Sequence, residues 1–358
     1  MNPQTAWLLP PEAYYDRAWF DRELDALFTP RWALIADEAE VPAPGDYVAA
    51  AVGRAPLVVI RREDGRLAAF HNLCRHRGVV LLEGTGNVTR TINCPYHDWR
   101  YELDGSLAVV PQRREQFPDL DPPRWGLLPA SVAVWEGMVF AHPDANAAPL
   151  ADALAGLPEQ LGSHRPGLLS EIVSDHIEAR CNWKLFVENH IDVYHLWYLH
   201  ERTLGAFDHH RFEYHQVGSN WASYEPLKES DLATSSLARS TTAISHLDDR
   251  DRLGIGAHMA FPNLLMATSA EFFATYVAEP VAPDRTIVEL RIRAEPGAEP
   301  ALLLEALRSF IMEDVAACEA VQRGVRSPMF AVGPLARDLE RPITSFHTNL
   351  LARLGEVR

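Results

Sequence analysis

Residues 71–78 read HNLCRHRG, and residues 94–99 read CPYHDW. Each stretch carries one cysteine and one histidine, namely Cys74 with His76 and Cys94 with His97. Seventeen residues separate the two pairs. Two arms that each offer a thiolate and an imidazole can converge on one metal centre. The sequence therefore predicts a metal site at this point of the chain.

A tetrahedral zinc site is the alternative, because two cysteines and two histidines satisfy zinc. Zinc fingers usually pair like ligands within an arm, whereas both arms here are mixed. Mixed arms suit a [2Fe–2S] cluster in which the two cysteines hold one iron and the two histidines hold the other. The ligand pattern favours the iron–sulfur centre over zinc.

Short strands surround these arms. Residues 56–62 and 66–70 are separated by Asp64-Gly65, a hairpin signal that Asp104-Gly105 repeats. Residues 42–148 are therefore expected to form a small all-β domain. The two cysteine–histidine arms would then each lie at the end of a strand of this domain.

The flanking segments differ in pattern. Residues 149–358 mix helical stretches with alternating strands such as 286–293, which predicts a larger domain with an antiparallel sheet flanked by helices and an α+β fold overall. Residues 1–41 are expected to be a helical lead that packs on this larger domain. Residues 231–254 have weak periodicity and are a candidate mobile loop or lid, with an ordinary surface insertion as the alternative.

The larger domain carries a second candidate metal site. If the chain is helical here, Glu188, Asp192 and His195 share one face, so that an acid lies beside an imidazole and orients it. His200 would lie about 140° away from His195 around the helix. We therefore expect a bend, bulge or helix end between the two histidines.

A facial site of two histidines and one carboxylate, typical of non-haem iron oxygenases, needs one more acid. The predicted helix 301–322 has Asp314 near the middle of its apolar stripe, with Glu313 at the edge as the fallback ligand. A buried Arg or Lys partner for Asp314 is the alternative. The stripe comprises Leu303, Leu307, Ile311, Cys318 and Val321.

Both motif sets resemble those of Rieske non-haem iron oxygenase α subunits, the aromatic-ring-hydroxylating dioxygenase family. The two cysteine–histidine runs look like the Rieske signature, although such oxygenases often have glycine where this chain has Asp98. The spacing Asp-x-x-His-x-x-x-x-His, followed by a late Glu-Asp helix, is similar to their mononuclear iron site. The resemblance implies a [2Fe–2S] cluster at Cys74, His76, Cys94 and His97, and Fe(II) at His195, His200 and Asp314.

The resemblance also implies a function. The chain would be a terminal oxygenase that activates O2 with electrons from the cluster and hydroxylates an aromatic or other small organic substrate. Oxidative N- or O-demethylation, or hydroxylation of a quaternary ammonium compound, is the alternative on the same scaffold, and a simple Rieske electron carrier is the non-enzyme alternative. Residues 206–278, including the run 261–264, are expected to line the substrate pocket.

Partners follow from the same family. Asp192 would bridge a Rieske histidine of a neighbouring subunit, most plausibly His97, to His195, which implies a head-to-tail homotrimer, with or without a β subunit. Gly254-Ile255-Gly256 lacks the third glycine of a dinucleotide loop. A separate NAD(P)H-dependent reductase, with or without a ferredoxin, is therefore expected to supply electrons.

Composition and charge limit the partners and the location that the chain can be expected to have. A net charge of −16 offers no electrostatic drive toward nucleic acid. No segment has the length and apolarity of a membrane span, and four cysteines in a chain of 358 residues fit a reducing compartment. We expect a cytoplasmic protein without membrane or nucleic-acid partners.

Overall fold

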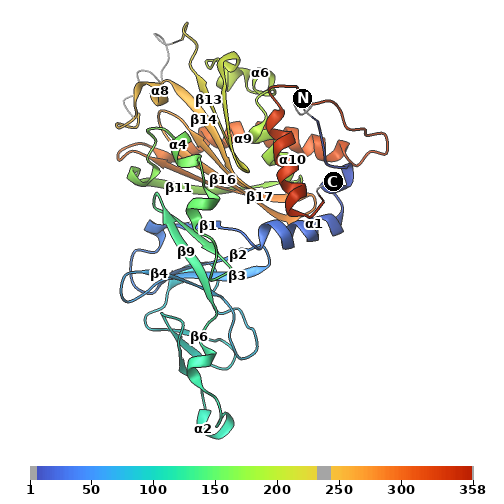
Figure 1. The fold of residues 1–358 in the computed structure, drawn as a ribbon. Coiled ribbons are helices and arrows are strands. Elements are labelled where there is room, and N and C mark those ends of the chain that lie inside the picture. Colours follow the sequence, from blue (N-terminus) through green and yellow to red (C-terminus); the bar gives the residue numbers. More distant parts are fainter. Residues whose placement is uncertain (1–5, 232–242, 357–358) are drawn as a thin grey trace. The chain divides into compact units, whose positions relative to one another are not determined.

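The computed structural model describes residues 6–231 and 243–356, which form two compact units (Figure 1). The smaller unit is Leu24–Asp152, and the larger combines Met1–Glu23 with Ala153–Arg358. Together they give the expected α+β fold. The predicted lead 1–41 is divided between the units, because β1 (Ala33–Asp37) pairs with β10 (Met138–His142) inside the smaller one.

The smaller unit contains two antiparallel sheets. A seven-stranded sheet has the order β1-β10-β9-β4-β3-β2-β5, and a three-stranded sheet has the order β6-β7-β8. Turns at Gly65 and Gly105, with φ of 79° and 84°, close the two predicted hairpins β3–β4 and β7–β8. The other bounds are β2 Asp46–Val52, β3 Ala55–Arg61, β4 Leu67–His71, β5 Thr85–Asn87, β6 Thr91–Asn93, β7 Arg100–Glu102, β8 Leu107–Val109 and β9 Pro129–Trp135.

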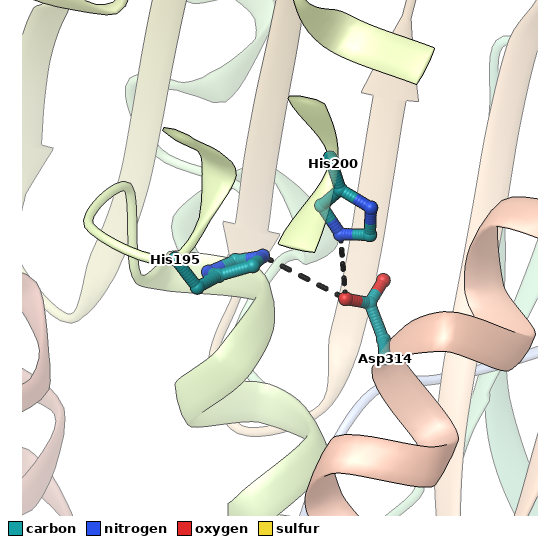
Figure 2. A group of neighbouring side chains, drawn as sticks. All are labelled: His195, His200 and Asp314. Atoms are coloured by element: carbon teal, nitrogen blue, oxygen red, sulfur yellow. Dashed lines mark hydrogen bonds and ion pairs between the residues drawn. The ribbon is translucent and has the colours of Figure 1, made fainter. Parts of the chain in front are cut away.

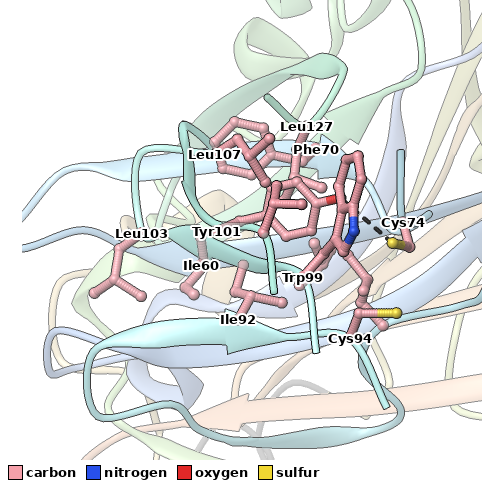
Figure 3. Packing of buried hydrophobic residues seen from close by; sticks show 13 residues of the cluster. Ile60, Phe70, Cys74, Ile92, Cys94, Trp99, Tyr101, Leu103, Leu107 and Leu127 are labelled. Atoms are coloured by element: carbon pink, nitrogen blue, oxygen red, sulfur yellow. Dashed lines mark hydrogen bonds between the residues drawn. The ribbon is translucent and has the colours of Figure 1, made fainter. Parts of the chain in front are cut away.

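A hydrophobic cluster fills the space beside the small sheet (Figure 3). Trp99 and Tyr101 are buried in it together with Cys74 and Cys94. Tyr101 contributes its ring to the core and its hydroxyl to the cysteine arm, since Oη lies 3.4 Å from Cys74 Sγ and accepts the Arg75 N–H at 2.9 Å. The packing thereby fixes the position of the first arm.

The larger unit is built on one antiparallel sheet of seven strands in the order β11-β17-β16-β15-β14-β13-β12. Six of its strands follow one another along the chain, so each pairs with its sequence neighbour. The predicted strand 286–293 is confirmed inside β17. The bounds are β11 Glu171–Ala179, β12 Glu213–Val217, β13 Asn220–Pro226, β14 Gly254–Ala260, β15 Leu264–Thr268, β16 Phe273–Ala282 and β17 Arg285–Ala294.

Two helices matter most for the site, α5 (Trp183–Ile191) and α9 (Pro300–Gly324). Helix α9 confirms the predicted helix 301–322, and it packs against α5, β11 and β17. The other α-helices are α1 Arg17–Glu23, α2 Arg113–Gln116, α3 Leu150–Ala153, α4 Leu157–Gln160, α6 Leu196–Leu199, α7 Glu201–Leu204, α8 Asp249–Arg252 and α10 Arg341–Arg353. Single 3-10 or π turns occupy Pro11–Tyr14, Leu24–Phe28, Glu38–Glu40, Pro122–Trp125, Pro166–Leu168 and His209–Arg211.

A buried ion pair fastens α1 to α5. Lys184 Nζ lies 2.6 Å from Glu23 Oε1, and the Trp183 indole N–H donates to Glu23 Oε2 at 2.9 Å. Both members of the ion pair are fully buried. Desolvation lowers the pKa of Lys184 and raises that of Glu23, and the attraction between them opposes both shifts.

Glu188 fastens α5 to two further segments. Its Oε1 accepts hydrogen bonds from the Tyr14 hydroxyl at 2.7 Å and from His347 Nε2 at 2.8 Å. The other ring nitrogen of His347 accepts the Leu8 N–H at 3.2 Å, which fixes the tautomer. Segments from both ends of the described chain therefore meet on one carboxylate.

Of the candidate loop 231–254, residues 232–242 lie outside the described part of the chain, and the remainder includes α8. No helix within the described residues has the length and apolar character that crossing a membrane requires.

We predict that Lys184→Met destabilises the protein by about 3–5 kcal/mol, because it leaves the Glu23 carboxylate buried without its cation. The unfolding midpoint in urea and the thermal midpoint are the measurements. Arg17→Met is the control, since Arg17 forms an exposed pair with Asp21 and its loss should cost no more than about 1 kcal/mol. Equal midpoints for the two variants would show that the buried pair contributes nothing.

Candidate metal centres and active-site cavity

His195 and His200 flank a short helix. Helix α5 ends at Ile191, and Asp192 has extended backbone angles. The Asp192 carboxylate accepts the Tyr194 N–H at 2.6 Å, a local turn that competes with helix continuation. The expected helical face of Glu188, Asp192 and His195 is therefore wrong.

The expected interruption near the histidines is present, but it falls at two places. Helix α6 ends at Leu199, which is the expected helix end between the two histidines, and a further break at Asp192 precedes both of them. His195 lies immediately before α6 and His200 immediately after it. Short α6 thereby presents one imidazole from each of its ends.

Three predicted side chains converge on one point (Figure 2). Asp314 Oδ1 lies 2.7 Å from His200 Nε2 and 3.6 Å from His195 Nε2. One ligand atom from each of the three lies within 4.8 Å of the others, close enough to hold a metal ion. Two imidazoles and a carboxylate form the donor set of a non-haem iron site, so these residues fit such an ion.

Each histidine contacts a second acid through its other nitrogen. His200 Nδ1 lies 2.9 Å from Glu313 Oε2, and His195 Nδ1 lies 3.2 Å from Asp192 Oδ2. The His195 contact is an ion-pair contact without a hydrogen bond. Both contacts leave Nε2 directed at Asp314, which is the orientation that metal binding requires.

Glu313 is therefore placed as a support of His200 in the structure, whereas the sequence offered it as a fallback ligand. Desolvation lowers the pKa of His200, but hydrogen bonds and charge from Asp314 and Glu313 outweigh it and raise the pKa overall. A metal ion would have to displace the resulting proton.

The apolar stripe of α9 is largely as predicted. Leu307, Ile311 and Cys318 are buried around Asp314. Val321, which was expected to be buried, is 45% exposed, and the neighbouring Gln322 is buried instead. Gln322 Oε1 accepts the Asn182 N–H at 2.7 Å, so this polar residue links α9 to the start of α5.

His190 lies near the ligands without joining them. Its Nε2 donates to the His258 carbonyl at 3.2 Å, and desolvation lowers the pKa of His190 to about 4. The imidazole is therefore neutral and engaged with the backbone.

Two of the three candidate metal ligands, His195 and Asp314, line a cavity of about 400 Å³. His195, Asp192 and Asp314 belong to its wall. Five aromatic rings and several aliphatic side chains make up much of the remainder, and none of the described lining residues is Lys or Arg. The aromatic residues are Phe186, Trp221, Phe272, Tyr276 and Phe310.

The expected pocket segment 206–278 contributes in part. Strands β13 to β16 supply many lining residues, but the described lining does not include the run 261–264. Phe261 instead packs near Phe346, with ring centroids 5.9 Å apart, and Asn263 Nδ2 donates to the Ala278 carbonyl at 3.0 Å. That run serves the core.

The cysteine–histidine arms of the smaller unit also converge. Cys74 and Cys94 are buried near each other, and desolvation raises the pKa of the Cys74 thiol. His76 Nδ1 lies 3.1 Å from His97 Nδ1. Paired thiols and paired imidazoles match a two-iron cluster with unlike ligands on its two irons.

Asp98 departs from the usual glycine for a visible reason. Its φ is 54°, in the left-handed region that glycine adopts freely and aspartate tolerates better than most residues. Arg100 donates to both carboxylate oxygens at 3.0 and 2.6 Å, and this hydrogen bonding lowers the pKa of Asp98. The turn beside His97 is thereby held by a side-chain pair.

Comparison with known proteins agrees with both halves of this picture. Residues 31–131 match the Rieske [2Fe-2S] domain, and residues 168–356 match the catalytic domain of ring-hydroxylating α subunits. The chain belongs to the Rieske non-haem iron oxygenases. Its cofactors are accordingly a Rieske cluster and a mononuclear iron, and it is an oxidoreductase rather than a zinc protein.

Individual Rieske oxygenases extend the match. The carnitine monooxygenase oxygenase subunit of Escherichia coli K12 is 29% identical over 99% of this chain and 95% of that protein. The corresponding subunit of Acinetobacter baumannii is 32% identical, over 62% of this chain and 59% of its own length. Choline monooxygenase from Spinacia oleracea is 27% identical over 96% of this chain and 78% of that protein.

A solved structure shows the same architecture. The quaternary ammonium Rieske monooxygenase CntA in complex with L-carnitine matches with a TM-score of 0.82 and 25% identity, over 98% of this chain and 97% of the other.

We predict that Asp314→Ala abolishes binding of the mononuclear iron while the Rieske spectrum stays intact. Glu313→Gln should weaken iron binding only about 10- to 100-fold, because it loosens His200 without removing a ligand. Iron content and visible and EPR spectra of anaerobically purified protein are the measurements.

Glu305→Gln is the matched control for these two variants, because Glu305 lies exposed on the same helix. It should leave both centres unchanged. Complete iron loss in Glu313→Gln with full retention in Asp314→Ala would reverse the two assignments.

Proposed function

We propose that this chain is the terminal oxygenase component of a monooxygenase system for a quaternary ammonium substrate. The observation that carries the proposal is the aromatic wall of the cavity beside His195 and Asp314. Aromatic faces attract a cation, and cages of such rings suit quaternary ammonium groups. Relatives that act on carnitine and choline support the same class.

Each predicted ligand receives a role in this proposal. Cys74, His76, Cys94 and His97 hold the Rieske cluster, and His195, His200 and Asp314 hold the mononuclear iron. The iron supplies activation of O2 at the positions that three facial protein ligands leave open. The protein's own contribution is to orient the imidazoles and to keep the cavity largely apolar around the substrate.

Asp192 is proposed as the electron-transfer bridge. It lies 3.2 Å from His195 Nδ1, and its exposed fraction leaves the carboxylate partly open to a second donor. The charge of an aspartate placed between two imidazole N–H groups attracts both of them and so couples them. The second imidazole would belong to His97 of a neighbouring subunit in a homotrimer.

Electrons must come from another protein. Gly254-Ile255-Gly256 lies in strand β14 rather than in a strand-turn-helix nucleotide loop. We propose a separate NAD(P)H-dependent reductase, with or without a ferredoxin, as the donor.

A substrate screen tests the proposed class. Holoenzyme with a surrogate reductase should couple O2 consumption to product formation with choline or carnitine, and much less with aromatic hydrocarbons. Product analysis by mass spectrometry separates coupled turnover from wasteful O2 consumption. Coupled turnover of aromatic substrates alone would reject the quaternary ammonium class and favour ring hydroxylation.

Asp192→Asn tests the bridge. Both metal centres should remain, while turnover falls about 10- to 100-fold because the asparagine carries no charge to couple the two imidazoles. Single-turnover oxidation of the reduced Rieske cluster, followed by its visible absorbance, is the measurement. Asp21→Asn, which alters the exposed ion pair with Arg17, is the control, and a normal oxidation rate in Asp192→Asn would exclude the bridge.

A further inference from the structure

A buried acid–imidazole pair forms part of the cavity wall. Glu225 on β13 is 4% exposed, and so is His209 in the turn His209–Arg211. Glu225 Oε2 contacts His209 Nδ1 directly. Sixteen positions separate the two residues in sequence.

The two members of the pair line different spaces. Glu225 lines the catalytic cavity, whereas His209 lines a second, more open pocket of about 480 Å³. Leu196 and Thr203 line both spaces, so the two are neighbours. The carboxylate therefore belongs to the wall that separates them.

Several contacts fix this carboxylate in place. Glu225 is paired with Ile255 of β14 within the sheet. The Trp197 ring lies 5.3 Å from the His209 ring at 70°, and Asp208 caps the turn by accepting the His210 N–H. Since strand and turn are both held, the charge has a defined position.

A carboxylate in a largely apolar wall is costly unless it is both hydrogen-bonded and paired with a positive charge, and the contact with His209 engages its Oε2 atom. None of the described lining residues is Lys or Arg. A trimethylammonium group carries positive charge but no N–H, so it approaches an acid through its methyl groups. It would not compete with the hydrogen bond between Glu225 and His209.

We propose that Glu225, held by His209, is the counter-charge that selects a quaternary ammonium head group, and that the cavity discriminates against substrates that also carry a carboxylate. This inference rests on the proposed function and narrows its substrate class. A substrate carboxylate would meet Glu225 and Glu271 in the wall, and none of the described lining residues is a Lys or Arg that could pair with it. Like charges in a site of low dielectric constant repel strongly.

Three matched probes test the proposal with the holoenzyme and a surrogate reductase. Choline and 3,3-dimethylbutan-1-ol have the same shape and differ in charge, and carnitine adds a carboxylate. For the native protein, kcat/KM should be at least about tenfold higher for choline than for either other probe. Carnitine turned over as efficiently as choline would overturn the discrimination against carboxylates.

The variant Glu225→Gln removes the charge and keeps the shape. The preference for choline over its neutral isostere should fall about tenfold or more, mainly through KM. Glu213→Gln on exposed β12 is the control and should keep the native preference. An unchanged preference in Glu225→Gln overturns the role of Glu225, even when choline is turned over.

A second variant separates the charge of Glu225 from the contact with His209. His209→Gln keeps the Glu225 charge but removes its imidazole partner, so the preference for the cation should persist. Loss of that preference with both metal centres intact would assign selection to His209 instead. Failure of the native protein to turn over any ammonium probe would reject the proposed function itself, which is a separate outcome.

Discussion

The structure of the candidate iron site depends on one constraint, the fixed orientation of the His200 imidazole between two acids. Asp314 and Glu313 are neighbours on α9, so their side chains leave the helix about 100° apart. One carboxylate contacts Nε2 at 2.7 Å, and the other contacts Nδ1 at 2.9 Å. Adjacent residues of one helix can therefore hold both nitrogens of one imidazole. The inner carboxylate is therefore the candidate metal ligand, and the outer one holds the imidazole.

Such precision requires that α5 and α9 keep their relative positions. Two hydrogen bonds join them directly, one from Cys318 Sγ to the Leu185 carbonyl and one from the Asn182 N–H to Gln322 Oε1. The buried Glu23–Lys184 pair also holds α5 to α1. Buried ion pairs add little net stability compared with apolar packing, but they penalise misplaced arrangements heavily. These buried polar contacts therefore fix the position of α5 more than they add to the stability of the fold.

Much of this arrangement could be predicted from sequence, and the reasons are local. Hairpin turns, the strand at 286–293 and the helix that carries Asp314 follow from periodicity and turn residues. The prediction of a helical face through Asp192 was wrong. The Asp192 side chain accepts a hydrogen bond from the Tyr194 N–H where the helix ends, and hydrophobic periodicity does not reveal such a bond. The prediction that Val321 is buried was wrong, because the hydrogen bond between Gln322 and Asn182 places Gln322 on the inner face of the helix instead.

The cavity wall was the least predictable part, because its chemistry comes from pairs of residues that are far apart in sequence and follow no recognisable spacing. His209 lies in a turn and Glu225 in a strand, and only the return of β13 along the sheet brings them together. A buried acid in a wall whose described lining has no Lys or Arg costs free energy that binding a neutral ring would not offset. It has a physical rationale when the ligand brings a positive charge. The proposed substrate class of this chain therefore rests on the composition of the wall rather than on the iron-binding motif that the family shares.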